Sequence, residues 1–249
     1  MLCKILSELP LNEVIRTSVL SRKWRYVRKI NPKLRFDGMT MCSGRSIYGS
    51  RQCTHEFIQN QHNGMFVEYF EVKFELHNEL VIHLDNWVRF FTASQTKNLA
   101  FDLVPVEFRG RSDRYLFPFE LLDYGSTLRL QRMQLGFVHI KLPSQFSGFP
   151  NLRKLDLHFV RATAKDLNLL SSCSSLEWLS MVIRCHLDDE LKVDLPLPCL
   201  LYLCVADSMI TGIRFNAMNL KTFVYRGWRY PIEIRSLDLK NAHLHFLTV

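Results

Sequence analysis

One apolar pattern returns twice at a fixed interval in the second half of the chain, and this spacing narrows the possible folds more than any other feature. The pattern places apolar residues at positions 1, 4 and 6 of a short segment. Its three copies are Leu152, Leu155 and Leu157, then Leu176, Leu179 and Met181, then Leu200, Leu203 and Val205. The copies start at residues 152, 176 and 200, so the period is 24 residues. A fixed period indicates a repeated structural unit.

A single copy of this pattern cannot bury its own apolar residues. Positions 4 and 6 share one face of an extended strand, so copies stacked side by side form one continuous core beneath a parallel sheet. Leucine-rich repeats have a period of roughly 20 to 29 residues. A doubly wound sheet also alternates strands with helices, but it predicts neither the fixed period nor the triplet. The sequence therefore favours an α/β fold, a leucine-rich-repeat solenoid with helices or loops on its convex side.

Looser apolar patterns extend the series on both sides of these copies. Alternating apolar residues predict further half-buried strands. The segments concerned are residues 34–36, 67–74, 99–103, 130–135 and 220–225. Ile234, Leu237 and Leu239 are interpreted as the last copy. The predicted repeats thus occupy residues 67–249.

Segments between the strands are expected to carry the chain back to the start of the next strand. An amphipathic helix is predicted by the i, i+3, i+4, i+7 spacing of Leu84, Trp87, Val88 and Phe91. Thr163 and Asp166, three residues apart, are typical of a capping box that opens a helix. Residues 105–125 are the longest interruption, interpreted as a surface insertion that carries Arg109, Arg111 and Arg114.

The strand face opposite the core is a candidate binding surface. In a leucine-rich solenoid, positions 3, 5 and 7 of each strand point outward on the concave side, where extended partners bind. The residues predicted to bind a partner there are Lys154, Asp156, His158, Trp178, Ser180 and Tyr202. Trp178 and Tyr202 occupy the same column, and strands about 4.8 Å apart bring their rings into reach. Neighbouring exposed aromatic residues are common at binding hot spots. The alternative is that another segment covers both rings.

Charge is concentrated at the N-terminus. The chain has a formal net charge of +8. Residues 1–37 hold nine basic and three acidic residues, a balance of +6, which leaves only +2 for the remainder. A nearly neutral repeat region disfavours a groove that follows phosphates, so no nucleic-acid partner is expected. The basic run at residues 22–29 is interpreted as a solvated helix face, with a nuclear address or nucleic-acid patch as the alternative.

Cysteine usage and hydropathy indicate in which cellular compartments we expect the protein. The seven cysteines include no Cys-x-x-Cys pair, which favours reduced thiols in the cytoplasm or nucleus. Neither a secretory signal nor an apolar run of roughly 18 residues appears in the sequence. We therefore expect no membrane partner.

Catalytic and metal-binding patterns find little support. The usual nucleophile, phosphate-loop and zinc motifs do not appear, so no enzyme activity, catalytic residue or cofactor is predicted. His243 and His245 share one strand face, but a third metal ligand is not nearby in sequence, and exposed strand residues are the favoured interpretation. Cys185 and His186, followed by acidic residues, are interpreted as a polar turn.

The first 37 residues predict three short helices. Leu2, Ile5, Leu6 and Leu9 have helical spacing, and Pro10 ends this first helix because a residue before proline disfavours the α region. Three helices of this size form too small a core to be stable alone. The segment is expected to pack on a partner or on the repeats.

This segment resembles an F-box, in the form found in plant F-box proteins with leucine-rich repeats of the FBD-associated type. The resemblance runs through Ile5-Leu6-Ser7, Leu9-Pro10-Leu11, Glu13, Thr17-Ser18, Leu20-Ser21 and Trp24-Arg25. It implies binding to the Skp-type adaptor of a cullin ubiquitin ligase. The adaptor-binding residues that it implies are Leu2, Ile5, Leu6, Leu9, Pro10, Leu11, Leu20 and Trp24.

The resemblance covers nearly the whole chain and implies three parts. Residues 1–37 would form a partial F-box, residues 38–66 a connecting segment, and residues 67–249 irregular leucine-rich repeats. Family members open with a Leu-Pro-Asp-type segment and commonly continue into a further C-terminal domain. The chain is therefore interpreted as truncated at both ends, or as a shortened gene product.

Three functions follow as hypotheses. The first is the non-catalytic substrate-recognition subunit of a cullin-type SCF ubiquitin ligase, with the F-box on the adaptor and the repeats on a target protein. The second is a repeat-only interaction module, or a decoy, whose truncated F-box does not bind the adaptor. The third is a nucleic-acid binder, which predicts binding that weakens steeply with salt.

Overall fold

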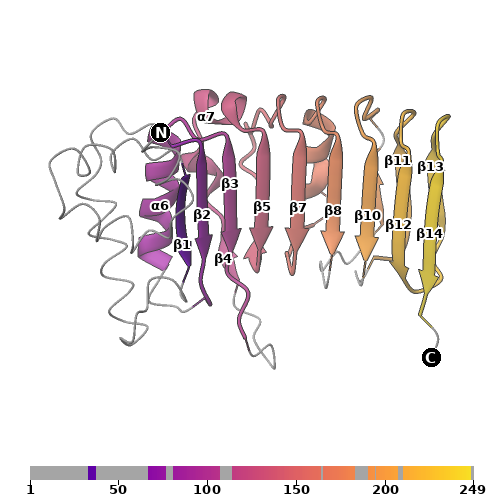
Figure 1. Cartoon of the computed structure of the whole chain (residues 1–249), viewed down its shortest axis with the longest axis horizontal. Coiled ribbons are helices and arrows are strands. Elements are labelled where there is room, and N and C mark those ends of the chain that lie inside the picture. Colours follow the sequence, from indigo (N-terminus) through magenta and orange to yellow (C-terminus); the bar gives the residue numbers. More distant parts are fainter. Residues whose placement is uncertain are drawn as a thin grey trace, which may run out of the picture. The chain divides into compact units, whose positions relative to one another are not determined.

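The computed structural model describes residues 33–37, 67–76, 81–106, 114–163, 165–182, 190–193, 195–206 and 210–247 (Figure 1). The chain divides into two compact units, Met1–Phe108 and Arg109–Val249. The predicted F-box helices and the connecting segment lie outside the described residues. The domain boundaries at residues 37 and 66 therefore stay predictions.

The described residues of the first unit form three parallel strands and a helix. They are β1 (Lys33–Asp37), β2 (Tyr69–Lys73), β3 (Asn98–Asp102) and α6 (Val81–Ala93), and the strand order is β1-β2-β3. The predicted helical face is confirmed, because Leu84, Trp87, Val88 and Phe91 are all buried.

Aromatic rings join the helix of the first unit to its strands. The Trp87 ring stacks on Phe36 with centroids 6.3 Å apart and an interplanar angle of 14°, and Phe74 approaches the same ring at 5.9 Å. Phe70 contacts Phe90 at 5.5 Å. Rings of this size bury large apolar areas, so they stabilise a unit that has few strands.

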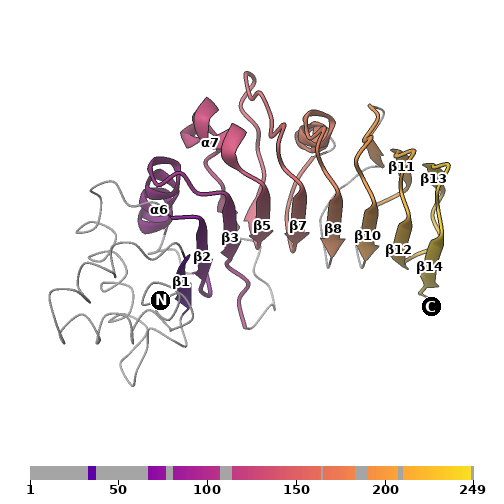
Figure 2. The ribbon, with the colours of Figure 1, turned by 45° about the horizontal axis from the view of Figure 1, so that its top comes forward.

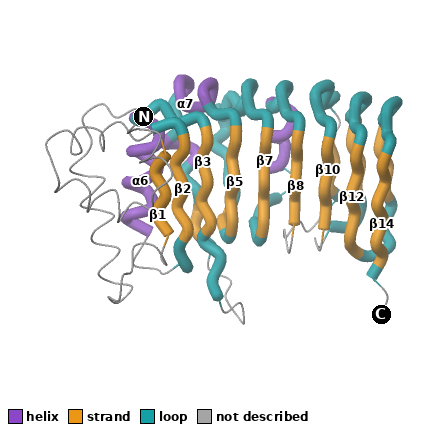
Figure 3. Tube along the Cα trace, in the orientation of Figure 1, coloured by secondary structure: helices purple, strands orange, loops and turns teal. Residues whose placement is uncertain are grey.

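The described residues of the second unit form a main sheet of six parallel strands. In chain order they are β5 (Arg132–Gly136), β7 (Lys154–His158), β8 (Trp178–Val182), β10 (Tyr202–Ala206), β12 (Thr222–Gly227) and β14 (Asn241–Phe246). Each pairs with the next in parallel (Figure 3). The fold class predicted from the period, an α/β leucine-rich-repeat solenoid, is confirmed.

Return segments lie on one side of this sheet, as Figures 1 and 2 show. They include a three-stranded parallel sheet of β9 (Leu191–Val193), β11 (Ile213–Asn216) and β13 (Ile232–Arg235). The shorter elements are β4 (Tyr115–Leu116), β6 (Val138–His139), α7 (Tyr124–Arg129), and the 3₁₀ helices η2 (Phe119–Leu121) and η3 (Asp166–Ser172). In the part of the chain that the structure describes, helices and short strands thus lie on one face of the ribbon, and no return segment lies on the other.

The repeat register follows the 1-4-6 pattern in the central copies. Leu155 pairs with Leu179, which pairs in turn with Leu203, and all three are buried between the sheet and the return segments. The strand entries also repeat, because the N–H groups of Glu177 and Trp178 both donate to the Arg153 carbonyl. Equivalent bonds recur at each neighbouring strand of the series.

The predicted capping box is confirmed at the start of η3. The Thr163 N–H donates to Asp166 Oδ2 at 3.0 Å, and the Asp166 N–H donates to Thr163 Oγ1 at 3.2 Å. Asp166 Oδ1 also accepts from the Leu142 N–H at 3.2 Å. One carboxylate therefore ties the return segment of one repeat to the loop of the preceding repeat.

The prediction of a surface insertion is wrong for the part of residues 105–125 that the structure describes. Tyr115, Phe117 and Phe119 are buried, and the Phe117 and Phe119 rings lie 4.9 Å apart. The Arg114 guanidinium donates to the Phe159 carbonyl at 2.9 Å. The aromatic residues, spaced two apart, fill the core here without following the 1-4-6 pattern. Arg109 and Arg111 lie outside the described residues.

The interpretation of Ile234, Leu237 and Leu239 as the last copy is also wrong. Ile234 belongs to β13 and pairs with Phe215 of the smaller sheet. The last strand of the main sheet is β14, in which Ala242 pairs with Phe223 and Leu244 pairs with Tyr225. This copy is difficult to recognise in the sequence, because position 4 is Ala242, whereas the other copies have a large apolar residue there.

Candidate binding surface

The structure describes one of the two predicted groups of site residues, the partner-binding group. Every residue predicted to bind the adaptor lies between residues 2 and 24, outside the described residues, so that prediction stays open. The six residues predicted to bind a partner all lie in β7, β8 and β10. We call the outward positions of β5, β7, β8, β10, β12 and β14 the open face.

The first column of the open face contains a stacked aromatic pair. Trp178 and Tyr202 are register partners, and their rings are parallel within 5° with centroids 5.2 Å apart. Lys154, the partner of Trp178 on the other side, places Nζ 3.9 Å from the centroid of the indole ring. Trp178 is therefore held between a cation and a second ring, and all three side chains are half-buried.

This arrangement favours a rigid platform over two separate side chains. Offset or parallel aromatic stacking and a cation over a ring each stabilise by about 0.5–1.5 kcal/mol beyond burial. Because Trp178 and Tyr202 are already ordered, a partner that packs on them loses little of their side-chain entropy. The predicted ring contact is thus confirmed, while its role in partner binding stays a proposal.

The second column carries Asp156, Ser180 and Cys204 in register. Burial raises the pKa of the Cys204 thiol, and the Asp156 carboxylate raises it further. Burial also raises the pKa of the Tyr202 hydroxyl, with Cys204 and Asp156 adding to the shift. Since only a thiolate is a good nucleophile, Cys204 is poorly suited to covalent chemistry at neutral pH.

The third column begins with Gly136 of β5, and His158 of β7 follows it. The imidazole lies against Gly136 of β5, and a methyl group added at Gly136 would overlap the ring. Val182 and Ala206 follow His158 in this column, and Arg226 and His245 continue it. The contact at Gly136 was missed from the sequence, because the neighbour of His158 depends on the register of β5 and β7.

The histidines of β14 lie where the sequence interpretation placed them. His243 and His245 are exposed and pair with Val224 and Arg226. Within the part of the chain that the structure describes, His, Cys, Asp and Glu residues form no group of three that suits a metal ion. Cys185 and His186 lie outside the described residues.

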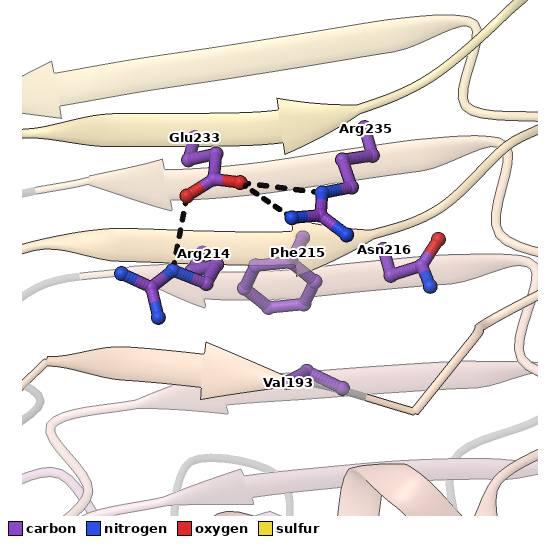
Figure 4. A pocket seen from close by; sticks show the side chains of 6 residues that line it. All are labelled: Val193, Arg214, Phe215, Asn216, Glu233 and Arg235. Carbon is purple, nitrogen blue, oxygen red and sulfur yellow. Dashed lines mark hydrogen bonds and ion pairs between the residues drawn. The ribbon is translucent and has the colours of Figure 1, made fainter.

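A pocket on the return side is a second candidate site. Figure 4 shows Glu233 between Arg214 and Arg235, beside Val193, Phe215 and Asn216. Arg214 Nε lies 3.0 Å from Glu233 Oε2, and Arg235 Nη2 lies 3.1 Å from Glu233 Oε1. Glu190 also reaches Arg214, at 3.5 Å. Two arginines are thus balanced by two glutamates, so net charge draws neither anions nor cations to this pocket.

The sequence and fold now point to one family. A family model described as the leucine-rich-repeat domain of At1g61320/AtMIF1 matches residues 58–248. The chain belongs to this leucine-rich-repeat family. The match includes every strand of the open face, so the family assignment and the repeat register concern the same residues.

Several proteins that are similar to this chain are named as F-box proteins. The F-box/FBD/LRR-repeat protein At3g52680 of Arabidopsis thaliana is 32% identical over 93% of this chain and 50% of its own length. The F-box/LRR-repeat protein At3g26922 of the same plant is 25% identical over 97% of this chain and 76% of its own length. The F-box/FBD/LRR-repeat protein At4g00160, also from Arabidopsis thaliana, is 27% identical over 93% of this chain and 51% of its own length.

These similarities confirm the predicted relationship to plant F-box proteins with leucine-rich repeats. The chain spans about half the length of two of these relatives, At3g52680 and At4g00160. No solved structure matches it significantly. Among the described residues, none of the helices combines the length and apolar character required to cross a bilayer.

Proposed function

We propose that this protein is the substrate-recognition subunit of a cullin-type SCF ubiquitin ligase. In this proposal the N-terminal segment binds a Skp-type adaptor, and the open face binds a target protein for ubiquitin transfer by other subunits. The relatives named as F-box/LRR-repeat proteins support the class of function. The observation that carries the target-binding half is the Lys154–Trp178–Tyr202 stack on the sheet face opposite the described return segments.

The stack has the properties of a protein hot spot. Hot spots are enriched in tryptophan and tyrosine, lie near the centre of an interface, and are surrounded by contacts that exclude water. Trp178 and Tyr202 lie on β8 and β10, in the middle of the β5–β14 series. The next outward residues along these strands, Ser180 and Cys204, are small and buried, so the two larger rings are the side chains that a partner can contact here.

The adaptor half is tested by co-purification. The full chain, co-expressed with a plant Skp-type adaptor, is expected to elute with it in size-exclusion chromatography. The double change Leu9→Ala with Pro10→Ala should abolish co-elution, because the resemblance places both residues in the adaptor contact. A matched control is Leu201→Ala with Pro198→Ala, which removes an exposed leucine and an exposed proline from the repeats.

The result of this test separates two functions. Co-elution that the control keeps and the N-terminal change abolishes supports the substrate-recognition subunit. If the unchanged chain does not bind the adaptor, the second candidate holds, a repeat-only module or decoy. We retain that candidate because every strand of the open face lies within residues 132–246, so the N-terminal segment contributes no strand to it.

The target half is tested in plant cells that express the full chain. We expect the double change Trp178→Ala with Tyr202→Ala to remove the proteins whose ubiquitination depends on this chain, while adaptor binding remains. The control is Val81→Ala with Leu195→Ala, since both residues are exposed and lie outside the open face. An unchanged set of ubiquitinated proteins in the double variant would contradict target binding by this surface.

A further inference from the structure

Apolar side chains are exposed at the end of the second unit that β14 forms. Leu244 and Phe246 occupy core-facing positions of β14, and Leu247 directly follows the strand, yet all three are exposed. Leu237 and Leu239, in the segment that leads into β14, are exposed as well. Large apolar side chains gathered in one place indicate a surface that another chain covers, whereas scattered single ones do not.

The backbone of β14 is open along the same edge. The N–H groups of Asn241 and Leu247 donate toward β12. Backbone groups alternate in direction along a strand, so Ala242, Leu244 and Phe246 direct theirs to the other side. Among the described strands, β14 has no neighbour on that side. The strand also contains no proline, lysine, arginine, aspartate or glutamate, the residues that commonly protect an edge, so it is a template for pairing with another strand.

Two copies of this edge fit each other in antiparallel pairing. A two-fold axis perpendicular to the sheet places the two β14 strands side by side in opposite directions, and it keeps the return segments of both copies on the same side. In the register centred on Leu244, the two Leu244 residues exchange backbone hydrogen bonds, and Ala242 exchanges them with the partner's Phe246. A small side chain then lies opposite a large ring, and the core-facing rows of the two copies join.

The smaller sheet ends beside β14 with a charge pattern that complements itself. β13 pairs only with β11 among the described strands, and Figures 1 and 2 show it next to β14. Its exposed residues are Glu233 and Arg235, on either side of Ile234. In antiparallel pairing centred on Ile234, each Glu233 lies opposite the partner's Arg235, and opposite charges across two strands attract. The same two-fold arrangement therefore suits both sheets.

We propose that two copies of this chain associate through β14 and β13, with each pair of strands antiparallel about one two-fold axis. The occupant of the edge is a second copy, because the edge complements itself in backbone direction, side-chain size and charge. A closed two-fold pair also covers the free edges of both sheets, so the assembly does not grow into fibres. This inference goes beyond the function proposed above and does not depend on it.

The pairing joins the open faces of the two copies into one surface. β8 and β14 lie three strand spacings apart, and one spacing separates the two β14 strands. The two Trp178 side chains are therefore seven spacings apart along the sheet, or about 34 Å. A target that carries two recognised segments contacts both copies at once and binds more tightly than a target with one segment.

The first test measures the mass of the full chain in solution by sedimentation velocity. The mass should rise from one chain to two between about 1 µM and about 100 µM. Leu244→Lys should stay monomeric over this range, because it places two like charges opposite each other at the axis. Leu116→Lys is the matched control and should dimerise like the wild type, since Leu116 is 50% exposed on β4 and Leu244 is 46% exposed. Thermal melts confirm that both variants fold.

A charge exchange tests the pairing of β13 separately. Arg235→Glu places glutamates opposite glutamates in the dimer, and Glu233→Arg places arginines opposite arginines, so each variant alone should dimerise about tenfold more weakly. An equal mixture of the two variants restores opposite charges across the axis and should dimerise like the wild type. Contacts within one chain do not change on mixing, so this recovery can come only from pairing between copies.

Each part of the proposal has a result that overturns it. A chain that stays monomeric up to about 100 µM would refute the association. A dimer that Leu244→Lys leaves unchanged would refute β14 as the contact, and masses that grow beyond two chains would refute a closed two-fold pair. A mixture of the charge variants that associates no better than each variant alone would refute the antiparallel pairing of β13. None of these results bears on adaptor or target binding, which does not require a second copy.

Discussion

The central strands and the last strand of the second unit carry similar apolar residues in opposite environments. Leu179 of β8 and Leu203 of β10 are both 0% exposed, whereas Leu244 and Phe246 of β14 are 46% and 39% exposed. β8 lies between β7 and β10, but β14 pairs only with β12 among the described strands. Each repeat is therefore buried by its neighbours, as expected for a solenoid stabilised by nearest-neighbour contacts.

A second contrast lies within a single strand. In β8, Leu179 faces the core and is fully buried, while Trp178, its neighbour in sequence, lies half-buried on the open face. The alternation of strand side chains therefore places Leu179 and Trp178 on opposite faces of β8, although Ser180, on the same face as Trp178, is only 4% exposed. Both contrasts can be tested by placing the same substitution in the two environments.

The largest effect is expected for a charge in the central core. Leu179→Asp would bury a carboxylate without a counter-charge, which should cost about 4 kcal/mol or more and unfold the central repeats. The same change at Leu244, Leu244→Asp, should cost about 1 kcal/mol or less, because that position is already in contact with water. Urea denaturation followed by circular dichroism measures both values. A native transition in Leu179→Asp would show that the register of the 1-4-6 pattern is wrong.

Truncation to alanine should also destabilise a central strand more than the last strand, but the difference in unfolding free energy should be smaller than for aspartate. Leu203→Ala leaves a cavity between two neighbouring repeats and should cost about 3 kcal/mol. Leu244→Ala removes a side chain with a neighbouring repeat on one side only, and it should cost about 1 kcal/mol or less. Equal losses in thermal melts of the two variants would contradict burial by neighbours as the source of stability.

The capping box supplies a smaller contribution between repeats. Asp166→Ala removes the bonds to Thr163 and to the Leu142 N–H, and it should cost about 1.5 kcal/mol. Asp238→Ala is the control, because the one contact of that carboxylate with the described residues is an exposed ion pair with Lys240 at 3.8 Å. A loss of stability equal to that of the control would show that the box does not join the two repeats.

The contribution of Asp166 should also depend on pH. Burial acts to raise the pKa of this carboxyl, but the hydrogen bonds from Thr163 and Leu142 outweigh it, and the pKa lies below its ordinary value of 3.8. Since the folded-state pKa is depressed, the stabilisation is fully present above pH 3.8 and disappears as pH falls through the folded-state pKa. The difference in stability between wild type and Asp166→Asn should therefore be constant near neutral pH and shrink at acidic pH. A difference that does not change with pH would contradict this origin.

The sequence predicted the main sheet best where each repeat carries large residues at positions 4 and 6. Leu155, Leu179 and Leu203 therefore placed three strands and their register correctly. The last strand was missed because Ala242 replaces a large apolar residue at position 4, so only the register with β12 shows the copy. The aromatic core around Phe117 and Phe119 was missed for a related reason, since its rings pack between segments that have no common period.

The open face was predicted in part. The period alone brought Trp178 beside Tyr202, because residues one period apart meet in neighbouring strands. The position of the Lys154 ammonium over the indole depends on side-chain rotamers, and the contact of His158 with Gly136 depends on a glycine outside the central copies. Neither feature has a periodic signal, so the sequence contained no simple pattern for them.

The most direct test of the account compares the unfolding free energies of Trp178→Ala and Leu179→Ala, two neighbours on opposite faces of β8. We expect a loss of about 1 kcal/mol for Trp178→Ala, from the stacking and cation contacts that Trp178 makes with Tyr202 and Lys154. For Leu179→Ala we expect a loss of about 3 kcal/mol, from the cavity left in the core. Equal and large losses would show that Trp178 belongs to the core, which would contradict the open face as a surface available for a partner.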